Sequence, residues 1–148
     1  MSGRAKAGLV ALGALLVLST LVAGLVTKAY PDDPFSGKAF TADGWLETWR
    51  CDGMSSSECR LHRSECQRGA MTQSLIDNHL GTGARRSDIE TLLGPPSFFG
   101  QVVENGRLYG ECAQYPLGYC SGLRIDLDTL YICYDPENLV QTAGHMQH

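Results

Sequence analysis

The sequence lacks the short motifs that mark most enzymes and metal sites. It contains no C-x-x-C pair, no H-E-x-x-H helix motif and no G-x-S-x-G nucleophile turn. Its four histidines, His62, His79, His145 and His148, do not stand at the spacings of metal ligands. We therefore expect a protein that is not an enzyme, with no catalytic residue, no metal and no cofactor.

Basic side chains are scarce after the N-terminal part. The chain has 12 Lys and Arg against 16 Asp and Glu, and three of the basic residues, Arg4, Lys6 and Lys28, precede residue 30 with no acid among them. The nine basic and 16 acidic side chains that remain give residues 30–148 a net charge of −7. Acidic surfaces repel nucleic acid and anionic lipid headgroups. We expect protein partners and no nucleic acid.

The longest charge-free segment is residues 7–27, "AGLVALGALLVLSTLVAGLVT". A helix of this length is about 31 Å long, which matches the hydrocarbon core of a bilayer. Basic residues precede the segment and Asp32 and Asp33 follow it, so the positive-inside rule places the N-terminus in the cytoplasm and the rest outside. Residues 1–29 are thus expected to be a transmembrane anchor. A cleaved signal sequence, cut near Thr27-Lys28-Ala29, is the alternative.

Residues 30–44 are rich in Pro, Asp and Gly, which predicts a tether between the anchor and a domain over residues 45–148. Trp45 and Trp49 are four residues apart and would share a face of a short helix. They could lie at the membrane interface, where Trp is enriched. The favoured interpretation is that they anchor a small core, because aromatic side chains supply much of the apolar area in small domains.

Six cysteines follow the apolar segment: Cys51, Cys59, Cys66, Cys112, Cys120 and Cys133. An even number of cysteines in an exported domain predicts disulfides, of which we expect at least two. Six cysteines allow 15 pairings, so the pairing stays open. Redox-active thiols are a weaker alternative, because no C-x-x-C pair is present to lower a thiol pKa.

Two helices are predicted before the sheet. Met71, Leu75, Ile76 and Leu80 recur at helical intervals, which predicts a helix over residues 64–80. The segment 87–94 predicts a second helix, with Ser87 and Glu90 as a capping box and Gly94 as its C-terminal cap.

The remaining sequence predicts three or four antiparallel strands. Asn105-Gly106 between two apolar runs is a strong hairpin signal. Residues 129–134 and 138–146 form a second alternating pair around a turn. In residues 123–128 the apolar residues have odd numbers, whereas those facing the core in residues 129–134 have even numbers. This change of phase predicts a bulge or bend at Asp128-Thr129. The predicted fold class is α+β, with two helices packed on one face of the sheet.

Asp126 and Asp128 alternate on the strand predicted over residues 123–128. They could form a metal site. The favoured interpretation is that they are exposed charges, which protect a strand edge from unwanted pairing.

Residues 70–143 resemble the SmpA/OmlA family of BamE-like bacterial periplasmic domains. The likeness rests on a glycine turn, a Leu-Gly-x-Pro helix end, a Tyr-x-Leu-Gly and an Ile-Asp before a strand. The matching residues are Gly83, Ile89, Leu93, Gly94, Pro96, Tyr115, Leu117, Gly118, Ile125, Asp126, Leu130, Tyr134 and Asp135, with Asn138 where relatives have a turn glycine. The resemblance implies two helices on an antiparallel sheet and a role in assembling envelope proteins.

Two features depart from that family. Ala84 and Arg85 replace its Met-Thr, and the first cysteine is Cys51, so the cysteine that carries the lipid of lipoprotein members has no counterpart. We therefore expect a single-pass protein of the inner membrane, anchored in the bilayer by residues 7–27, with its C-terminal domain in the periplasm.

The predicted function is a non-enzymatic, membrane-tethered periplasmic interaction domain that supports the assembly or stability of an envelope protein complex. The alternative is an accessory subunit of an inner-membrane complex, for example a respiratory one. In that case the apolar segment packs through the small residues Gly8, Gly13, Ser19, Ala23 and Gly24.

Overall fold

The structure is a computed structural model that describes residues 33–121 and 125–147. The predicted anchor, residues 7–27, lies outside the described residues. Within them, no helix has both the length and the apolar character needed to cross a bilayer.

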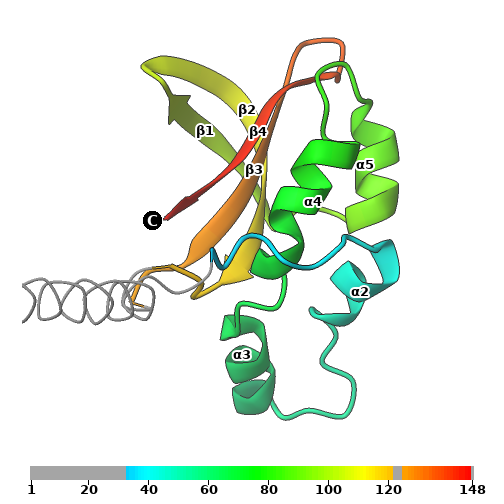
Figure 1. The fold of residues 1–148 in the computed structure, drawn as a ribbon, viewed down its shortest axis with the longest axis vertical. Coiled ribbons are helices and arrows are strands. Elements are labelled where there is room, and N and C mark those ends of the chain that lie inside the picture. Colours follow the sequence, from blue (N-terminus) through cyan, green and yellow to red (C-terminus); the bar gives the residue numbers. More distant parts are fainter. Residues whose placement is uncertain (1–32, 122–124, 148) are drawn as a thin grey trace, which may run out of the picture. The chain divides into compact units, whose positions relative to one another are not determined.

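In the described part of the chain, helices come first and strands follow (Figure 1). The helices are α2 (Ala42–Glu47), α3 (Ser56–Ser64), α4 (Gly69–His79) and α5 (Arg86–Leu93). The strands are β1 (Phe98–Glu104), β2 (Arg107–Gly118), β3 (Asp128–Tyr134) and β4 (Val140–Gln147). They form one antiparallel sheet in the order β1-β2-β3-β4. The α+β class and the antiparallel sheet are confirmed, whereas the expected number of two helices is too low.

The helix expected over residues 64–80 is present but shorter, as α4 (Gly69–His79), and a separate helix, α3, precedes it. Glu65 has an extended backbone that ends α3, and α4 begins only at Gly69. A capping box starts α3: Glu58 N–H donates to Ser55 Oγ, and Ser55 N–H donates to the Glu58 carboxylate. Hydrogen bonding of the Glu58 carboxylate to the Ser55 side chain, and then to the Ser55 backbone N–H, lowers the pKa of Glu58.

The N-terminal part of the domain includes much of the expected tether. Phe35 is buried in the core and its ring stacks on His145 of β4 at 3.8 Å. Backbone hydrogen bonds join Lys38 N–H to Ala70 O and Gln73 N–H to Phe35 O, at 3.1 and 2.8 Å. The domain therefore starts at Asp33 and not at Trp45, because two phenylalanines in the expected tether, Phe35 and Phe40, are apolar enough to join the core.

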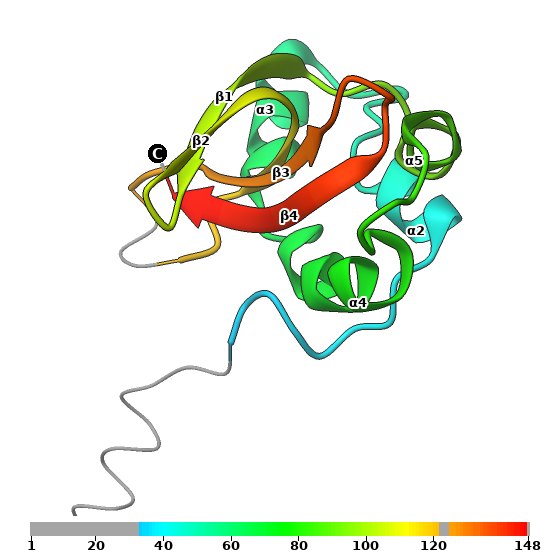
Figure 2. The same cartoon turned by 90° about the horizontal axis from the view of Figure 1, so that it is seen from above.

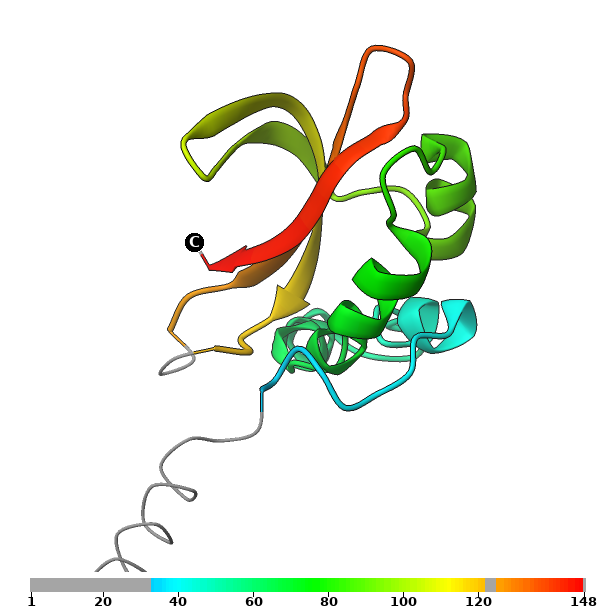
Figure 3. The same cartoon turned by 45° about the horizontal axis from the view of Figure 1, so that its top comes forward.

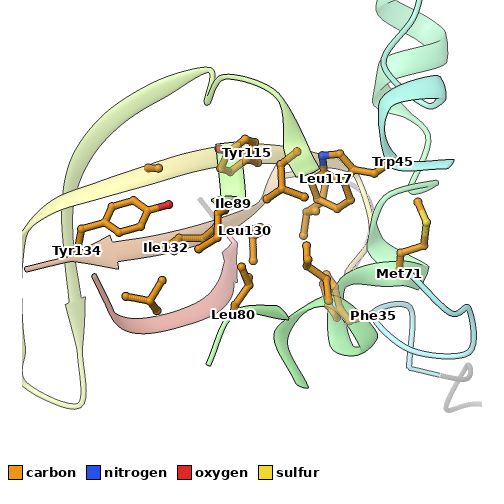
Figure 4. Packing of buried hydrophobic residues seen from close by; sticks show 14 residues of the cluster. Phe35, Trp45, Met71, Leu80, Ile89, Tyr115, Leu117, Leu130, Ile132 and Tyr134 are labelled. Atoms are coloured by element: carbon orange, nitrogen blue, oxygen red, sulfur yellow. The ribbon is translucent and has the colours of Figure 1, made fainter. Parts of the chain in front are cut away.

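The main core lies between the sheet and the helices (Figure 4). Leu130, Ile132 and Tyr134 of β3 point to this side, as their alternation predicts. Trp45 is fully buried among them, so its core role is confirmed. Met71 and Leu75 of α4 and Ile89 and Leu93 of α5 cover the sheet.

A hairpin of β1 and β2 curves away from the helices (Figures 1 and 3). Asn105 and Gly106 form its turn with positive φ angles of 50° and 77°, as the sequence predicts. The register shifts between Gly100 and Val102, where β2 contributes one extra residue and bends. From above, the hairpin arches over the sheet face opposite the helices (Figure 2).

Of the strand expected over residues 123–128, the described residues 125–127 are not in a strand, and β3 begins at Asp128. The predicted irregularity is present, but on the neighbouring strand: the register shifts between Pro116 and Gly118, which pair with Thr129 and Asp128. Residues 122–124 lie outside the described residues.

Candidate functional site

The residues shared with the SmpA/OmlA pattern lie mainly in the core and at turns. Ile89, Leu93, Tyr115, Leu117 and Tyr134 are buried in the main core. The turn positions Gly83, Gly94 and Gly118 all have positive φ, and so does Asn138, at 60°. Asp135 Oδ1 accepts hydrogen bonds from the N–H groups of Glu137 and Leu139 and so holds the β3–β4 turn. These positions mainly build the fold, and three of them, Leu93, Gly94 and Pro96, also line a groove of about 400 Å³ at the end of α5.

The expected capping box of α5 is wrong. The helix begins at Arg86, and Arg85 before it is extended and forms an isolated bridge to Leu139. Arg86 N–H donates to Asn138 O at 3.0 Å. This pairing places Ser87 inside the helix, where its side chain caps nothing, and Glu90 binds Arg86 instead at 2.7 Å.

All six cysteines form disulfides, in the pairs Cys51–Cys59, Cys66–Cys120 and Cys112–Cys133. The expectation of at least two bridges is confirmed. The second bridge ties the α3–α4 connection to the end of β2, where a Cβ on Gly118 would collide with the carbonyl of Glu65. The third joins directly paired positions of β2 and β3.

Asp126 and Asp128 do not form a pair of exposed strand charges. Asp126 and Ile125 precede β3 and are exposed, whereas Asp128 is buried. The Asp128 carboxylate accepts hydrogen bonds from Cys120 N–H, Ser121 N–H and Ser121 Oγ at 2.6–2.8 Å. It therefore fixes Cys120 and Ser121 beside the Cys66–Cys120 bridge. Among the residues that the structure describes, no three acidic, histidine or cysteine side chains lie together as a metal site would require.

The β1–β2 hairpin carries the main group of exposed apolar side chains. Phe99, Val103 and Leu108 are 45, 68 and 58% exposed, and we call these three residues the hairpin surface. Phe98, which is 44% exposed, pairs with Gln114 and faces the opposite side of the sheet. Val103 and Leu108 are direct cross-strand partners, and Phe99 pairs with Ala113, whose side chain lies in the main core. Phe99, Val103 and Leu108 therefore continue the helix side of the sheet beyond the last helix.

Charged side chains flank the hairpin surface. The Arg86 guanidinium lies 4.5 Å from the ring centre of Phe99 and 5.5 Å from that of Tyr134. It also pairs with Glu90 and, at 3.1 Å, with Glu111 of β2. Hydrogen bonding to Glu90 and then to Glu111 raises the pKa of Arg86. The surface thus combines apolar side chains with a fixed ionic rim, as protein interfaces do.

The other side of the hairpin is packed, so the hairpin is held in place. Val102, Cys112, Tyr131 and Cys133 form a second buried cluster, with Tyr109 and Met146 against it. Thr142 Oγ1 of β4 donates to the Glu104 carboxylate at 2.9 Å, 38 residues away in sequence. The hairpin surface is therefore presented on a fixed support.

Sequence reasoning did not identify the hairpin surface. The strand alternation was visible, because Phe99 and Val103 share a phase. Which of the two alternating sets of side chains is exposed depends on where the helical layer ends. The end of that layer is set by tertiary packing and cannot be read from the strand alone.

No protein-family model, curated protein or solved structure matches this chain. The resemblance to the SmpA/OmlA family stays a prediction.

Proposed function

We propose that this protein is a non-enzymatic, membrane-tethered periplasmic domain that supports the assembly or stability of an envelope protein complex, and that it contacts its partner through the hairpin surface. The observation that carries the proposal is the set of three exposed apolar side chains, Phe99, Val103 and Leu108, on one face of a supported hairpin. Exposed apolar groups that gather in one place mark interaction sites in soluble domains. Scattered ones need no such explanation.

Three other observations support the proposal. The segment 7–27 contains no charged residue and is long enough to serve as a membrane tether. Three disulfides are typical of proteins exported to an oxidising compartment. The SmpA/OmlA-like pattern favours a role among envelope proteins of a Gram-negative bacterium.

The test is a co-purification from cells that produce the protein naturally, using a C-terminal tag, gentle detergent and mass spectrometry. The double variant Val103→Glu/Leu108→Glu places two charges on the hairpin surface, and we expect it to lose the co-purifying partner. Leu61→Glu is the matched control, because Leu61 is also 68% exposed but lies on α3. Equal recovery of the partner with both variants contradicts the proposed surface. A turnover by the purified protein that one point substitution abolishes contradicts the non-enzymatic role.

A second candidate function is an accessory single-pass subunit of an inner-membrane complex. It is favoured by small residues along the apolar segment, namely Gly8, Gly13, Ser19, Ala23 and Gly24, since such residues allow transmembrane helices to approach closely. Replacing residues 7–27 by an unrelated transmembrane segment separates the two functions. Loss of the partner favours the subunit role, and retention excludes it.

A further inference from the structure

Arg68 is a buried cation at the start of α4. Its side chain is almost completely enclosed, with 5% of the residue exposed. The guanidinium lies 4.4 Å from the ring centre of Trp45 and 4.4 Å from that of Trp49. Nε and Nη2 donate to Trp45 O at 3.3 Å, and Nε also donates to Thr48 Oγ1 at 3.2 Å. Two aromatic rings and the end of α2 therefore hold the side chain in one position.

No described carboxylate balances this charge. The ion pairs within residues 33–121 and 125–147 involve Arg50 and Arg86 but not Arg68. Nη1 of Arg68 makes no hydrogen bond with any group in that part of the chain. Desolvation, aided by repulsion from Arg63, lowers the pKa of Arg68 to about 10, so the group is still charged at neutral pH. A buried charge without a counter-ion is costly.

Arg68 lines a groove of about 400 Å³. The walls are mainly apolar and contain no acidic residue: the lining is Leu46, Trp49, Arg50, Arg68, Leu93, Gly94, Pro95, Pro96 and Ser97. The groove therefore combines apolar walls with a fixed guanidinium that still has N–H groups to donate. This chemistry fits a carboxylate attached to an apolar group.

We propose that this groove binds the C-terminal carboxylate of a partner polypeptide whose last residue is apolar, with Arg68 as the anion-binding side chain. The position of the groove favours a polypeptide. Its lining ends at Ser97, and β1 begins at the next residue. β1 is an edge strand of the described sheet. A segment that paired antiparallel with β1 would have its C-terminal end beside Phe98.

This inference rests on the proposed function only in taking a polypeptide as the ligand. It is tested on the purified full-length protein in detergent micelles, without the cellular partner, so the two proposals can fail separately. Trp45 and Trp49 are the only tryptophans in the chain, and both contact Arg68. Intrinsic tryptophan fluorescence therefore reports directly on the groove.

The probe is the N-acetylated pentapeptide Thr-Val-Thr-Val-Leu with a free carboxylate, and its control is the same peptide with a C-terminal amide. We expect a saturable fluorescence change with the acid and binding at least about tenfold weaker with the amide, because a charge-assisted hydrogen bond to Arg68 is lost. N-acetyl-leucine is the third ligand. It should bind more weakly than the acid peptide, since it cannot pair with β1.

The matched variants are at the exposed groove residue Ser97, because replacing buried Arg68 risks unfolding. Ser97→Glu brings a negative charge to the groove and should abolish binding of the acid peptide, whereas Ser97→Gln should retain it. Equal binding of acid and amide overturns the proposal, as does unchanged binding to Ser97→Glu. If N-acetyl-leucine binds as tightly as the peptide, the polypeptide assignment is wrong.

Discussion

The two faces of the sheet are stabilised in different ways. On the helix side, 14 buried residues form one core that includes Trp45, Tyr115 and Leu130 (Figure 4). On the opposite side, four buried residues form a small cluster, and two of them are the bridged Cys112 and Cys133. The large face is held mainly by burial of apolar area, with the Cys66–Cys120 bridge at its edge. In the small face, a disulfide supplies two of the four buried residues.

This difference explains where exposed apolar side chains occur. The helical layer ends before the hairpin does, so the helix-side positions Phe99, Val103 and Leu108 are uncovered. The small cluster and the Cys112–Cys133 bridge support the same hairpin from behind. The hairpin surface is thus exposed on one side of the hairpin and supported by packed side chains on the other.

The largest expected effect is in the main core. Trp45→Ala should lower the free energy of unfolding by about 3–5 kcal/mol, since it removes a fully buried aromatic side chain and leaves a cavity. Val102→Ala in the small cluster should cost only about 1–2 kcal/mol. Urea unfolding followed by circular dichroism measures both. Similar losses from the two variants would contradict the unequal contribution of the faces.

Removing the disulfides should have graded effects that follow loop length. The bridges Cys66–Cys120, Cys112–Cys133 and Cys51–Cys59 span sequence separations of 54, 21 and 8 residues. Paired Cys→Ala variants should therefore lose about 4, 3 and 2.5 kcal/mol, respectively, in the chain-entropy account. The midpoints of urea unfolding, compared among variants whose unfolding free energy has the same dependence on urea concentration, rank the three losses. A larger loss for Cys51–Cys59 than for Cys66–Cys120 would show that native contacts, and not loop closure, dominate.

Alkaline pH should destabilise both faces through buried phenols. Burial is the main cause that raises the pKa of Tyr131 and Tyr134 to about 12, from an ordinary value of 10.0. The folded state therefore holds these protons more tightly than the unfolded state, so stability is retained below about pH 10 and is lost as the pH rises toward about 12. The lowered pKa of Arg68 acts in the opposite direction.

Two single substitutions show how much each face of the sheet contributes to this pH dependence. Tyr131 lies in the small cluster and Tyr134 in the main core. Tyr131→Phe and Tyr134→Phe should each flatten the decline of unfolding free energy between about pH 10 and pH 12. A decline that neither variant changes would assign the effect to other groups.

The smallest expected effect on stability is at the hairpin surface. Val103→Glu/Leu108→Glu should lower the free energy of unfolding by only about 1 kcal/mol in total, because both side chains already face solvent and the main cost is repulsion between two carboxylates at paired positions. The same urea titration measures this change. A loss of several kcal/mol would mean that these side chains stabilise the fold and are not a free surface.

One local sequence pattern, a serine followed three residues later by a glutamate, occurs twice and predicts the structure correctly only once. Ser55 and Glu58 form a capping box, and so should Ser87 and Glu90 by the same spacing. At the second position, Arg85 pairs with Leu139 and the helix starts earlier, which leaves Ser87 without a capping role. A long-range backbone contact overrode a short-range preference.

The parts of the fold that depend on neighbouring residues were predictable, and those that depend on distant ones were not. The Asn105-Gly106 hairpin and the alternation of β3 follow from turn chemistry and strand period. The burial of Asp128 depends on hydrogen bonds from Cys120 and Ser121. The groove at Arg68 depends on α2, α5 and the residues after α5 together, so no local pattern indicates it.

The most direct test of the account is site-specific photo-crosslinking in cells that produce the protein naturally. A photoreactive benzoylphenylalanine replaces Val103 in one variant, Leu61 in a second and Ile125 in a third, all of which are strongly exposed apolar positions. We predict a defined crosslinked partner from position 103 and none from positions 61 and 125. The same crosslink from all three positions, or from position 61 alone, would contradict the assignment of the hairpin surface as the binding site.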